Sequence, residues 1–168
     1  VDIVKFASAY GTWLRRRGRG PLRVVTGRDA RVSGPVVAAL VNSSLRSAGI
    51  DVIDAGLVTT PTVEVAVTGL GAGGGIILTA SHNPAQWNAL KLLNEEGEFL
   101  SDADGREVLA LAAAEDFDYV TYDKLGKETR DDSWTEKHIA MVAGMKLTDC
   151  DAIRKAGFTI AVDAVNSV

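Results

Sequence analysis

Hydrophobic residues recur at helical spacing in several stretches of the chain. In residues 3–17 the apolar positions are Ile3, Phe6, Ala7, Tyr10 and Leu14, which predicts an amphipathic helix. Arginines 15–17 close it, where positive charge suits the helix dipole. A second helix is predicted to begin at Ser33 or Gly34, with Pro35 in its first turn, and to end at Gly49. The remaining predicted helices are 60–68, 101–114, 134–145 with Ile139, Val142 and Met145 as its inner face, and a short helix or connection at 148–157.

Short apolar runs lie between these helices and predict buried strands. The predicted strands are 22–26, 51–54, 75–79, 89–93 and 158–163, while the polar segment 116–132 is predicted to be a loop or linker. Strands that alternate with helices indicate a three-layer α/β/α fold with a mixed, mostly parallel sheet of about four strands. We expect residues 1–150 to form this domain. Residues 151–168 are expected to be a linker and the first strand of a truncated second domain.

Composition and charge narrow the functional classes. The chain has 168 residues, of which 46% are hydrophobic and 24% charged, and its net charge is -4. An acidic balance argues against a nucleic-acid partner, and no apolar run approaches the ~20 residues of a membrane span. The single cysteine, Cys150, excludes an internal disulfide framework. A chain with no recognisable secretory signal is expected to be cytoplasmic, and its start at Val1 and end on a strand suggest a piece of a longer protein.

Three glycines match a nucleotide-binding pattern in the wrong context. Gly69, Gly71 and Gly74 fit G-x-G-x-x-G, but a dinucleotide fingerprint follows a strand and opens a helix. Here a predicted helix precedes the glycines and a predicted strand follows them. We therefore interpret them as a helix-to-strand turn. The chain has no P-loop motif.

Ser81 is the strongest candidate for chemistry. It follows the predicted strand 75–79, and ligands of open α/β sheets bind outside the carboxyl ends of strands. Asn83-Pro84 forms a tight turn, His82 lies beside the serine, and Lys91 is one short strand away. A Ser-His-Asn-Pro sequence is also common in surface turns, so the pattern by itself leaves both interpretations open.

Other chemistries have weaker support. A serine hydrolase needs G-x-S-x-G, and Thr79 and Asn83 stand where the glycines belong. His138 is the other histidine that could act as a base, and it is more simply explained as a solvated helix residue. The two histidines and scattered carboxylates show no metal-ligand spacing.

Five segments resemble the α-D-phosphohexomutase superfamily, which includes phosphoglucomutase, phosphomannomutase and phosphoglucosamine mutase. They occur in the family's order across nearly the whole chain, and the serine loop is the most specific of them. The resemblance implies a four-domain enzyme of which this chain is roughly the first. One local departure is Ala89, where the family usually has glycine, and this affects the expected placement of Lys91. The segments are 27–35, 54–61, 79–84, 87–91 and 162–166.

The resemblance also implies a mechanism. Ser81 would carry a phosphoryl group, and hexose 1-phosphate and hexose 6-phosphate would interconvert through a hexose 1,6-bisphosphate, which also serves as activator. Lys91 would neutralise phosphate charge or move a proton, and His82 would hydrogen-bond the phosphate or hold the loop. Mg²⁺ would bridge the phosphate on Ser81 and an acidic loop of a missing domain. The expected substrate contacts are Arg28, Arg31 and Asn83, with pairing of the arginines to Asp29 as the alternative.

The resemblance leaves several questions open. Phosphoglucosamine mutases usually have aspartate where this chain has Trp87, which favours glucose or mannose over glucosamine. The expected partners are phosphorylated hexoses and the remaining domains of the same polypeptide. Because those domains would supply the metal and sugar loops, the chain alone is expected to be inactive. A serine hydrolase and a non-catalytic sugar-phosphate-binding module remain the alternatives outside the family.

Overall fold

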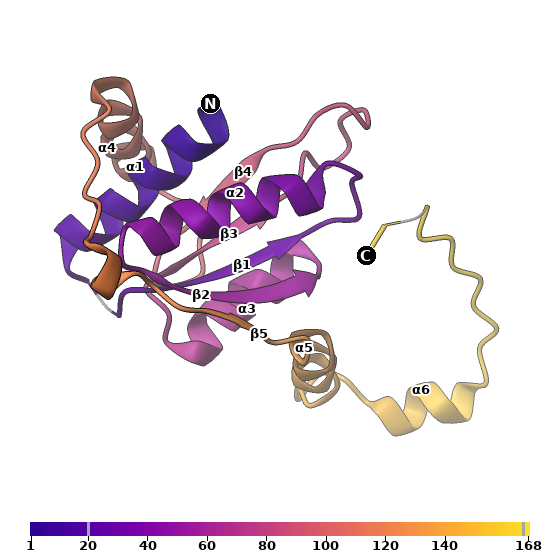
Figure 1. The fold of residues 1–168 in the computed structure, drawn as a ribbon. Helices are drawn as coiled ribbons and strands as arrows, with labels where there is room; N and C mark the ends of the chain where they lie inside the picture. Colours follow the sequence, from indigo (N-terminus) through magenta and orange to yellow (C-terminus); the bar gives the residue numbers. More distant parts are fainter. Residues whose placement is uncertain (20, 166) are drawn as a thin grey trace.

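A five-stranded sheet lies at the centre of the fold (Figure 1). The computed structural model describes residues 1–19, 21–165 and 167–168. The strand order is β4-β3-β1-β2-β5. Strands β1, β2, β3 and β5 run parallel, and β4 pairs antiparallel with β3. The strands are β1 (Arg23–Arg28), β2 (Asp51–Leu57), β3 (Gly74–Leu78), β4 (Leu90–Leu93) and β5 (Glu128–Arg130).

Helices cover both faces of this sheet, which confirms the three-layer prediction. Helices α1, α2 and α4 contribute to the hydrophobic core on one face, which includes Tyr10 and Trp13. Helix α3 and the buried Trp134 of α5 contribute to the core on the other face. The helices are α1 (Asp2–Arg17), α2 (Gly34–Ser47), α3 (Thr60–Leu70), α4 (Asp102–Ala114), α5 (Trp134–Ala143) and α6 (Cys150–Ala156), with a short 3-10 helix at Tyr122–Lys124.

The ends of the helices follow from local chemistry. Helix α1 ends at Gly18, whose φ of 59° is one that glycine adopts without steric cost. The Thr59 hydroxyl accepts a hydrogen bond from the Thr62 N–H at the start of α3, and Ser101 caps α4 in the same way. Helix α3 ends at Gly71 and β3 begins at Gly74, so the glycine-rich segment is the predicted helix-to-strand turn.

Strand β5 corrects the prediction of about four strands. It lies in the segment 116–132 that the polar pattern predicts as a loop, and it pairs with β2 from Val52↔Glu128 to Asp54↔Arg130. All three of its residues are exposed. An exposed edge strand shows no hydrophobic alternation, so pairing alone reveals it.

The predicted strand 158–163 is absent from the part of the chain that the structure describes. Phe158, Ile160 and Val162 are between 73% and 83% exposed. A β-branched run forms a strand only when its backbone groups find a partner strand, and these residues have none among those described. Asn166, the last residue of the fifth family-like segment, lies outside the described residues.

The predicted inner face of α5 is wrong. Ile139, Val142 and Met145 are exposed, whereas Trp134 is buried and lies against Gly69 of α3. Periodicity identifies an apolar face but does not say whether another element covers it. The His138 Nδ1 atom lies 3.0 Å from the Thr62 hydroxyl, so this histidine contacts α3. None of the described helices is long and apolar enough to cross a membrane.

Candidate active site

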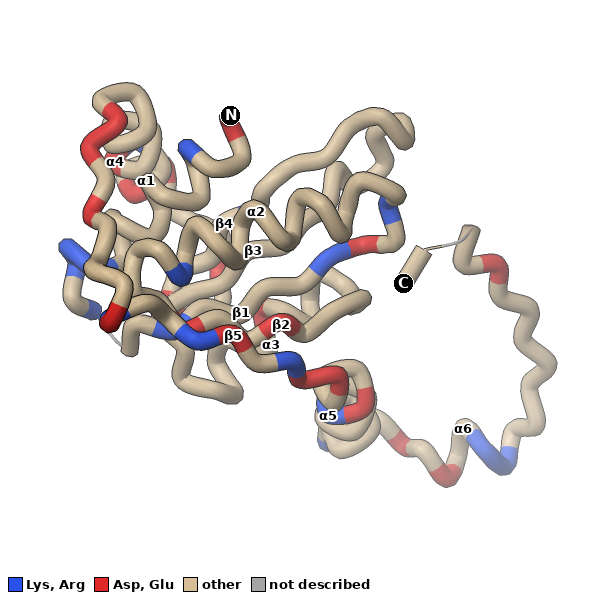
Figure 2. The backbone as a smooth tube through the Cα atoms, viewed as in Figure 1, with Lys and Arg blue, Asp and Glu red and all other residues tan. Residues whose placement is uncertain are grey.

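The candidate site lies at the edge of the sheet that is formed by the carboxyl ends of its parallel strands. Strands β1, β2, β3 and β5 all end there, and ligands of open α/β sheets bind at this place. Ser81 follows β3, Arg28 is the last residue of β1, and the loop after β1 contains Asp29 and Arg31. Figure 2 shows basic and acidic residues close together in that loop. The topology therefore brings two of the family-like segments, 27–35 and 79–84, to the same place.

Ser81 has an unusual backbone conformation. Its φ is 55°, in the left-handed region that residues other than glycine rarely adopt. Its N–H donates to the Thr79 hydroxyl at 3.0 Å, and that hydroxyl donates to the Asp29 carboxylate at 2.7 Å. The Ser81 hydroxyl lies 3.4 Å from the Nδ1 atom of His82, and both residues are exposed. The hydroxyl is thus accessible while the backbone beneath it is hydrogen-bonded.

Arg31 crosses from the β1 loop to the serine loop. Its Nη2 donates to the carbonyl oxygens of Ser81 and Asn83 at 2.9 and 2.8 Å. Its Nη1 donates to the carbonyl oxygens of Pro84 and Trp87, both at 2.9 Å. Its Nε donates to the Asp29 carboxylate at 3.0 Å. This arginine is therefore engaged with the protein's own backbone.

Arg28 and Asn83 are also engaged within the protein. The Arg28 Nη1 donates to the Asp29 carbonyl oxygen at 3.2 Å, and the Arg28 side chain lies close to Gly34 at the start of α2. The Asn83 side-chain amide donates to the Ala80 carbonyl oxygen at 2.8 Å and so closes the serine turn. Both residues hold loop structure at the candidate site, and their contact with substrate stays a prediction.

Lys91 lies on the neighbouring strand. It is opposite Ile77 in the β3–β4 ladder, and its ammonium lies 5.8 Å from the centroid of the Phe99 ring. The Thr79 N–H donates to the Ala89 carbonyl oxygen at 3.1 Å, so Ala89 continues the pairing of the two strands. Within the described chain, Lys91 makes no hydrogen bond to the serine loop. The structure thus brings His82, Asn83 and Arg31 to Ser81 and leaves Lys91 beside Phe99.

Thr79 and Asp29 belong to the site, although the sequence analysis named Asp29 only as a pairing partner of the arginines and gave Thr79 no role. Thr79 is 7% exposed and its hydroxyl links Asp29 to the Ser81 backbone. A buried threonine directly after an apolar strand and before the candidate serine is a signal that could have found it. The partnership with Asp29 spans 50 residues and is visible only in the fold.

The residues that the structure describes do not form a magnesium site by themselves. The described residues contain no group of three or more acidic, histidine or cysteine side chains that could hold a metal ion. The carboxylate nearest to the serine loop, that of Asp29, already accepts hydrogen bonds from Arg31 and Thr79. Because Mg²⁺ needs free oxygen ligands, the chain by itself does not fit this metal.

A second charged cluster lies at the far end of the same edge. Arg130 of β5 donates to Asp54 at 2.7 Å and to Asp132 at 2.6 Å. Burial lowers the pKa of Arg130, but its hydrogen bonds to these carboxylates outweigh burial and hold the pKa above its ordinary value. The hydroxyl of Ser133 bonds the carboxylate of Asp131 and is the main cause that lowers the pKa of this aspartate.

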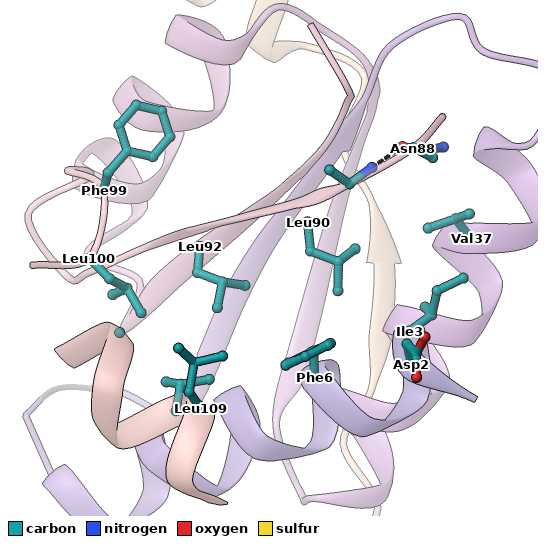
Figure 3. A pocket seen from close by; sticks show the side chains of 13 residues that line it. Asp2, Ile3, Phe6, Val37, Asn88, Leu90, Leu92, Phe99, Leu100 and Leu109 are labelled. Atoms are coloured by element: carbon teal, nitrogen blue, oxygen red, sulfur yellow. Dashed lines mark hydrogen bonds between the residues drawn. The ribbon is translucent and has the colours of Figure 1, made fainter. Parts of the chain in front are cut away.

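A separate cavity of about 540 Å³ lies on the face of α1 and α4 (Figure 3). Figure 3 shows Phe6 and Ile3 of α1, Leu90 and Leu92 of β4, and Leu109 of α4 around it. Asp2 is the only charged residue among the described residues of its lining. An apolar lining with a single acidic group does not suit a phosphorylated sugar, so this cavity is not the candidate site.

Comparison with known proteins agrees with the motifs. Residues 2–119 match the family model described as phosphoglucomutase/phosphomannomutase, alpha/beta/alpha domain I. A phosphoglucomutase/phosphomannomutase of Thermococcus kodakarensis is 37% identical over 97% of this chain, which covers 35% of that protein. A phosphoglucosamine/phosphogalactosamine mutase of Sulfurisphaera tokodaii is 29% identical over 99% of this chain, again covering 35% of that protein. The chain thus spans about a third of the length of these curated relatives.

The fold agrees with solved structures as well. A phosphoglucomutase/phosphomannomutase family protein from Burkholderia thailandensis superposes with a TM-score of 0.71 at 26% identity, over 87% of this chain and 32% of that one. The family model, the relatives and the fold lead to the same conclusion. The chain belongs to the phosphoglucomutase/phosphomannomutase family, in which residues 2–119 correspond to the α/β/α domain I.

Proposed function

We propose that this chain is the phosphoserine domain of an enzyme that interconverts hexose 1-phosphate and hexose 6-phosphate. The observation that carries the proposal is the geometry of Ser81. Its hydroxyl is exposed at the carboxyl end of β3, beside His82, on a loop whose backbone is hydrogen-bonded to Arg31 and Thr79. Phosphoryl transfer depends mainly on such positioning and on neutralisation of charge.

The proposed reaction has two phosphoryl transfers. First the bond between phosphorus and the Ser81 oxygen breaks, and phosphorus bonds to the free hydroxyl oxygen of the hexose monophosphate. That hydroxyl loses its proton and the serine oxygen gains one. The resulting hexose 1,6-bisphosphate reorients so that its other phosphoryl group faces Ser81, and that group is transferred back to the serine. Hexose 1,6-bisphosphate would also serve as an activator, because it would phosphorylate a Ser81 that carries no phosphoryl group.

His82 and Lys91 are the proposed catalytic partners of Ser81. The His82 ring nitrogen, 3.4 Å from the serine oxygen, is close enough to hydrogen-bond a phosphate there. Lys91 is the nearest lysine along the paired strands, and its ammonium would neutralise phosphate charge or move a proton of the sugar hydroxyl. This role requires the Lys91 side chain to leave Phe99.

Mg²⁺ is part of the proposal only together with the rest of the polypeptide. The phosphate on Ser81 would be this chain's single contribution to the metal, because the described residues provide no group of carboxylates for it. Neither of the two proposed phosphoryl transfers is routed through the metal. Phosphorylated hexoses and the further domains are the corresponding proposed partners.

The identity of the sugar stays a proposal. Glucose and mannose phosphates are favoured by Trp87, which stands where the glucosamine branch usually has aspartate. The relatives divide on this point, because one is named phosphoglucomutase/phosphomannomutase and another phosphoglucosamine/phosphogalactosamine mutase. Glucosamine phosphate therefore remains the second candidate substrate.

Radiolabelled hexose 1,6-bisphosphate tests the proposal in the full-length protein. Phosphate should appear on Ser81 in peptide mapping, and Ser81→Ala should lose both the label and turnover. Ser43→Ala, which changes an exposed serine of α2, is the matched control and should keep both. Label on another residue would contradict the role of Ser81. Reaction of Ser81 with a fluorophosphonate, without phosphoryl transfer, would contradict the mutase and favour a hydrolase.

The chain by itself is expected to be catalytically silent. A coupled assay of residues 1–168 with Mg²⁺, a hexose bisphosphate and glucose 1-phosphate should yield no glucose 6-phosphate. The reason is that metal and sugar-binding groups would come from other domains, and their loss costs several kcal/mol at the transition state. Measurable turnover would show that the site is complete within this chain.

A further inference from the structure

The guanidinium of Arg31 uses all of its hydrogen-bond donors within the protein. An arginine has five N–H donors in a planar fork. Four of them bond the carbonyl oxygens of Ser81, Asn83, Pro84 and Trp87, and the fifth bonds the Asp29 carboxylate. No donor is left for a substrate phosphate. The Arg31 and Asp29 side chains are only 11% and 17% exposed, so water competes little for these bonds.

These contacts hold Ser81 at both of its backbone polar groups. Its carbonyl oxygen accepts from Arg31, and its N–H donates to the Thr79 hydroxyl. Asp29 joins the two, because its carboxylate accepts from the Arg31 Nε and from the Thr79 hydroxyl. A left-handed backbone at a residue with a side chain is strained, and it persists only where surrounding contacts determine it.

We propose that Arg31 is a positioning residue for Ser81, acting together with Asp29 and Thr79, and not a ligand of the substrate phosphate. This inference rests on the proposed phosphoserine function. Arg31 fixes the left-handed backbone of Ser81 and thereby the direction in which its hydroxyl leaves the loop. Displacement of a reacting atom by about 1 Å can cost roughly 100-fold in rate, so a loosened loop would slow transfer without preventing sugar binding.

Charge gives a second reason for an arginine at this position. A phosphoserine carries about −1.5 to −2 charges at pH 7. The four carbonyl oxygens that accept from Arg31 are partially negative and belong to the same loop. Bound to a guanidinium, they repel a phosphate on Ser81 less than they would if they were free. A lysine has three donors from one nitrogen and cannot occupy four carbonyls and a carboxylate at once.

The test compares Arg31→Lys with wild type in the full-length protein. We expect kcat to fall by about 100-fold while KM for the sugar phosphate stays within a few-fold, because positioning is lost and binding is kept. Arg46→Lys is the matched control. Arg46 also donates to a carbonyl oxygen and a carboxylate, of Gly126 and Glu128, near the end of α2. It should retain wild-type kcat.

Hydrogen exchange of the segment 79–89 provides a readout that does not depend on activity. Arg31→Lys should raise the exchange of this segment, and Arg46→Lys should leave it unchanged. If wild-type Ser81 took no phosphate but Arg31→Lys still loosened the loop, the proposed function would fail while the positioning contact stood. An unchanged loop, or a KM raised ten-fold or more with kcat kept, would overturn the positioning role.

Thr79 provides a second pair of variants in case Arg31→Lys does not fold. Thr79→Val removes the hydroxyl that joins Asp29 to the Ser81 N–H, whereas Thr79→Ser retains it. We expect Thr79→Val to lower kcat at least ten-fold with KM little changed, and Thr79→Ser to restore most of the rate. Equal kcat in the two variants would overturn the inference, because the hydroxyl would then have no part in positioning Ser81.

Discussion

Two arginines hold opposite ends of the same sheet edge in different ways. Arg31 is 11% exposed and bonds four backbone carbonyls and one carboxylate of two adjacent loops. Arg130 is 47% exposed and bonds the carboxylates of Asp54 and Asp132, which joins β5 to β2. Arg31 holds the backbone of the serine loop, whereas Arg130 pairs with carboxylates that water also solvates. We therefore expect changes at the serine end to affect chemistry and changes at the Arg130 end to affect stability.

The largest expected effect at the serine end, after loss of Ser81 itself, is that of Lys91→Met. Turnover of the full-length enzyme should fall by about 100-fold or more, the scale of a lost acid–base or charge-stabilising group. Lys127→Met, which changes an exposed lysine beside β5, is the control at the other end. Steady-state turnover measures both. A loss of only a few-fold would mean that Lys91 stays beside Phe99 and outside the reaction.

Gly56→Ala should be the most destabilising change near Arg130. Gly56 has a φ of 77°, and a Cβ atom there would collide with the Arg130 guanidinium. The strained backbone alone should lower the free energy of unfolding by about 1–3 kcal/mol. Gly105→Ala in α4 is the matched control, because a Cβ there meets nothing within 4 Å. It should stabilise by up to about 1 kcal/mol.

Urea unfolding of both glycine variants gives these free energies. Equal stability of Gly56→Ala and wild type would mean that β2 relaxes at this position and that its pairing with β5 is not rigid. That result would weaken the contrast between the two ends, because the β2 backbone that carries Asp54, the partner of Arg130, would then be free to shift.

Arg130→Met should have a smaller effect that depends on salt. Exposed ion pairs contribute about 0–1 kcal/mol, and Arg130 is nearly half exposed. The loss of stability should be clear at about 0.01 M salt and nearly vanish at about 1 M, where the Debye length is only ~3 Å. Unfolding in urea at both salt concentrations measures it. A loss that is the same at both concentrations would show that packing, not charge, holds β5.

Ser133→Ala should have the smallest effect, and it should depend on pH. The Ser133 hydroxyl lowers the folded-state pKa of Asp131 below the unfolded value of about 3.9. A lowered pKa contributes stability above the unfolded value and loses it as the pH falls through the folded pKa. We expect a few tenths of a kcal/mol at pH 7 between variant and wild type, shrinking below about pH 4. A difference that grows in acid would contradict this sign.

The prediction of secondary structure succeeded where burial repeats along the chain. Helix α1 has a regular apolar face, and β3 is an uninterrupted buried run, so both were predicted within one or two residues of their ends. Strand β5 was missed because its residues are exposed and only β2 makes it a strand. The inner face of α5 was assigned wrongly because Ile139 and Val142 repeat at helical spacing without a partner to cover them.

The candidate site divides in the same way. The motif around Ser81 made the serine, His82 and the neighbouring turn candidates, since these residues are adjacent in the chain. The hydrogen bonds from Arg31 to the serine loop were visible only in the structure. Four of the five acceptors of Arg31 lie 50 to 56 residues further along the chain, and these four are backbone carbonyls, which every residue has.

The sequence by itself determined the α/β class of the fold, which follows from its hydrophobic period. Its motifs, by their resemblance to a known family, also indicated the family and made Ser81 the candidate for the chemistry. The tertiary structure decided that β5 completes the sheet, that Lys91 lies beside Phe99, and that Arg31 holds the serine loop. The physical reason is that hydrogen bonds to a backbone carbonyl depend on where chain segments meet and leave no trace in the identity of the accepting residue.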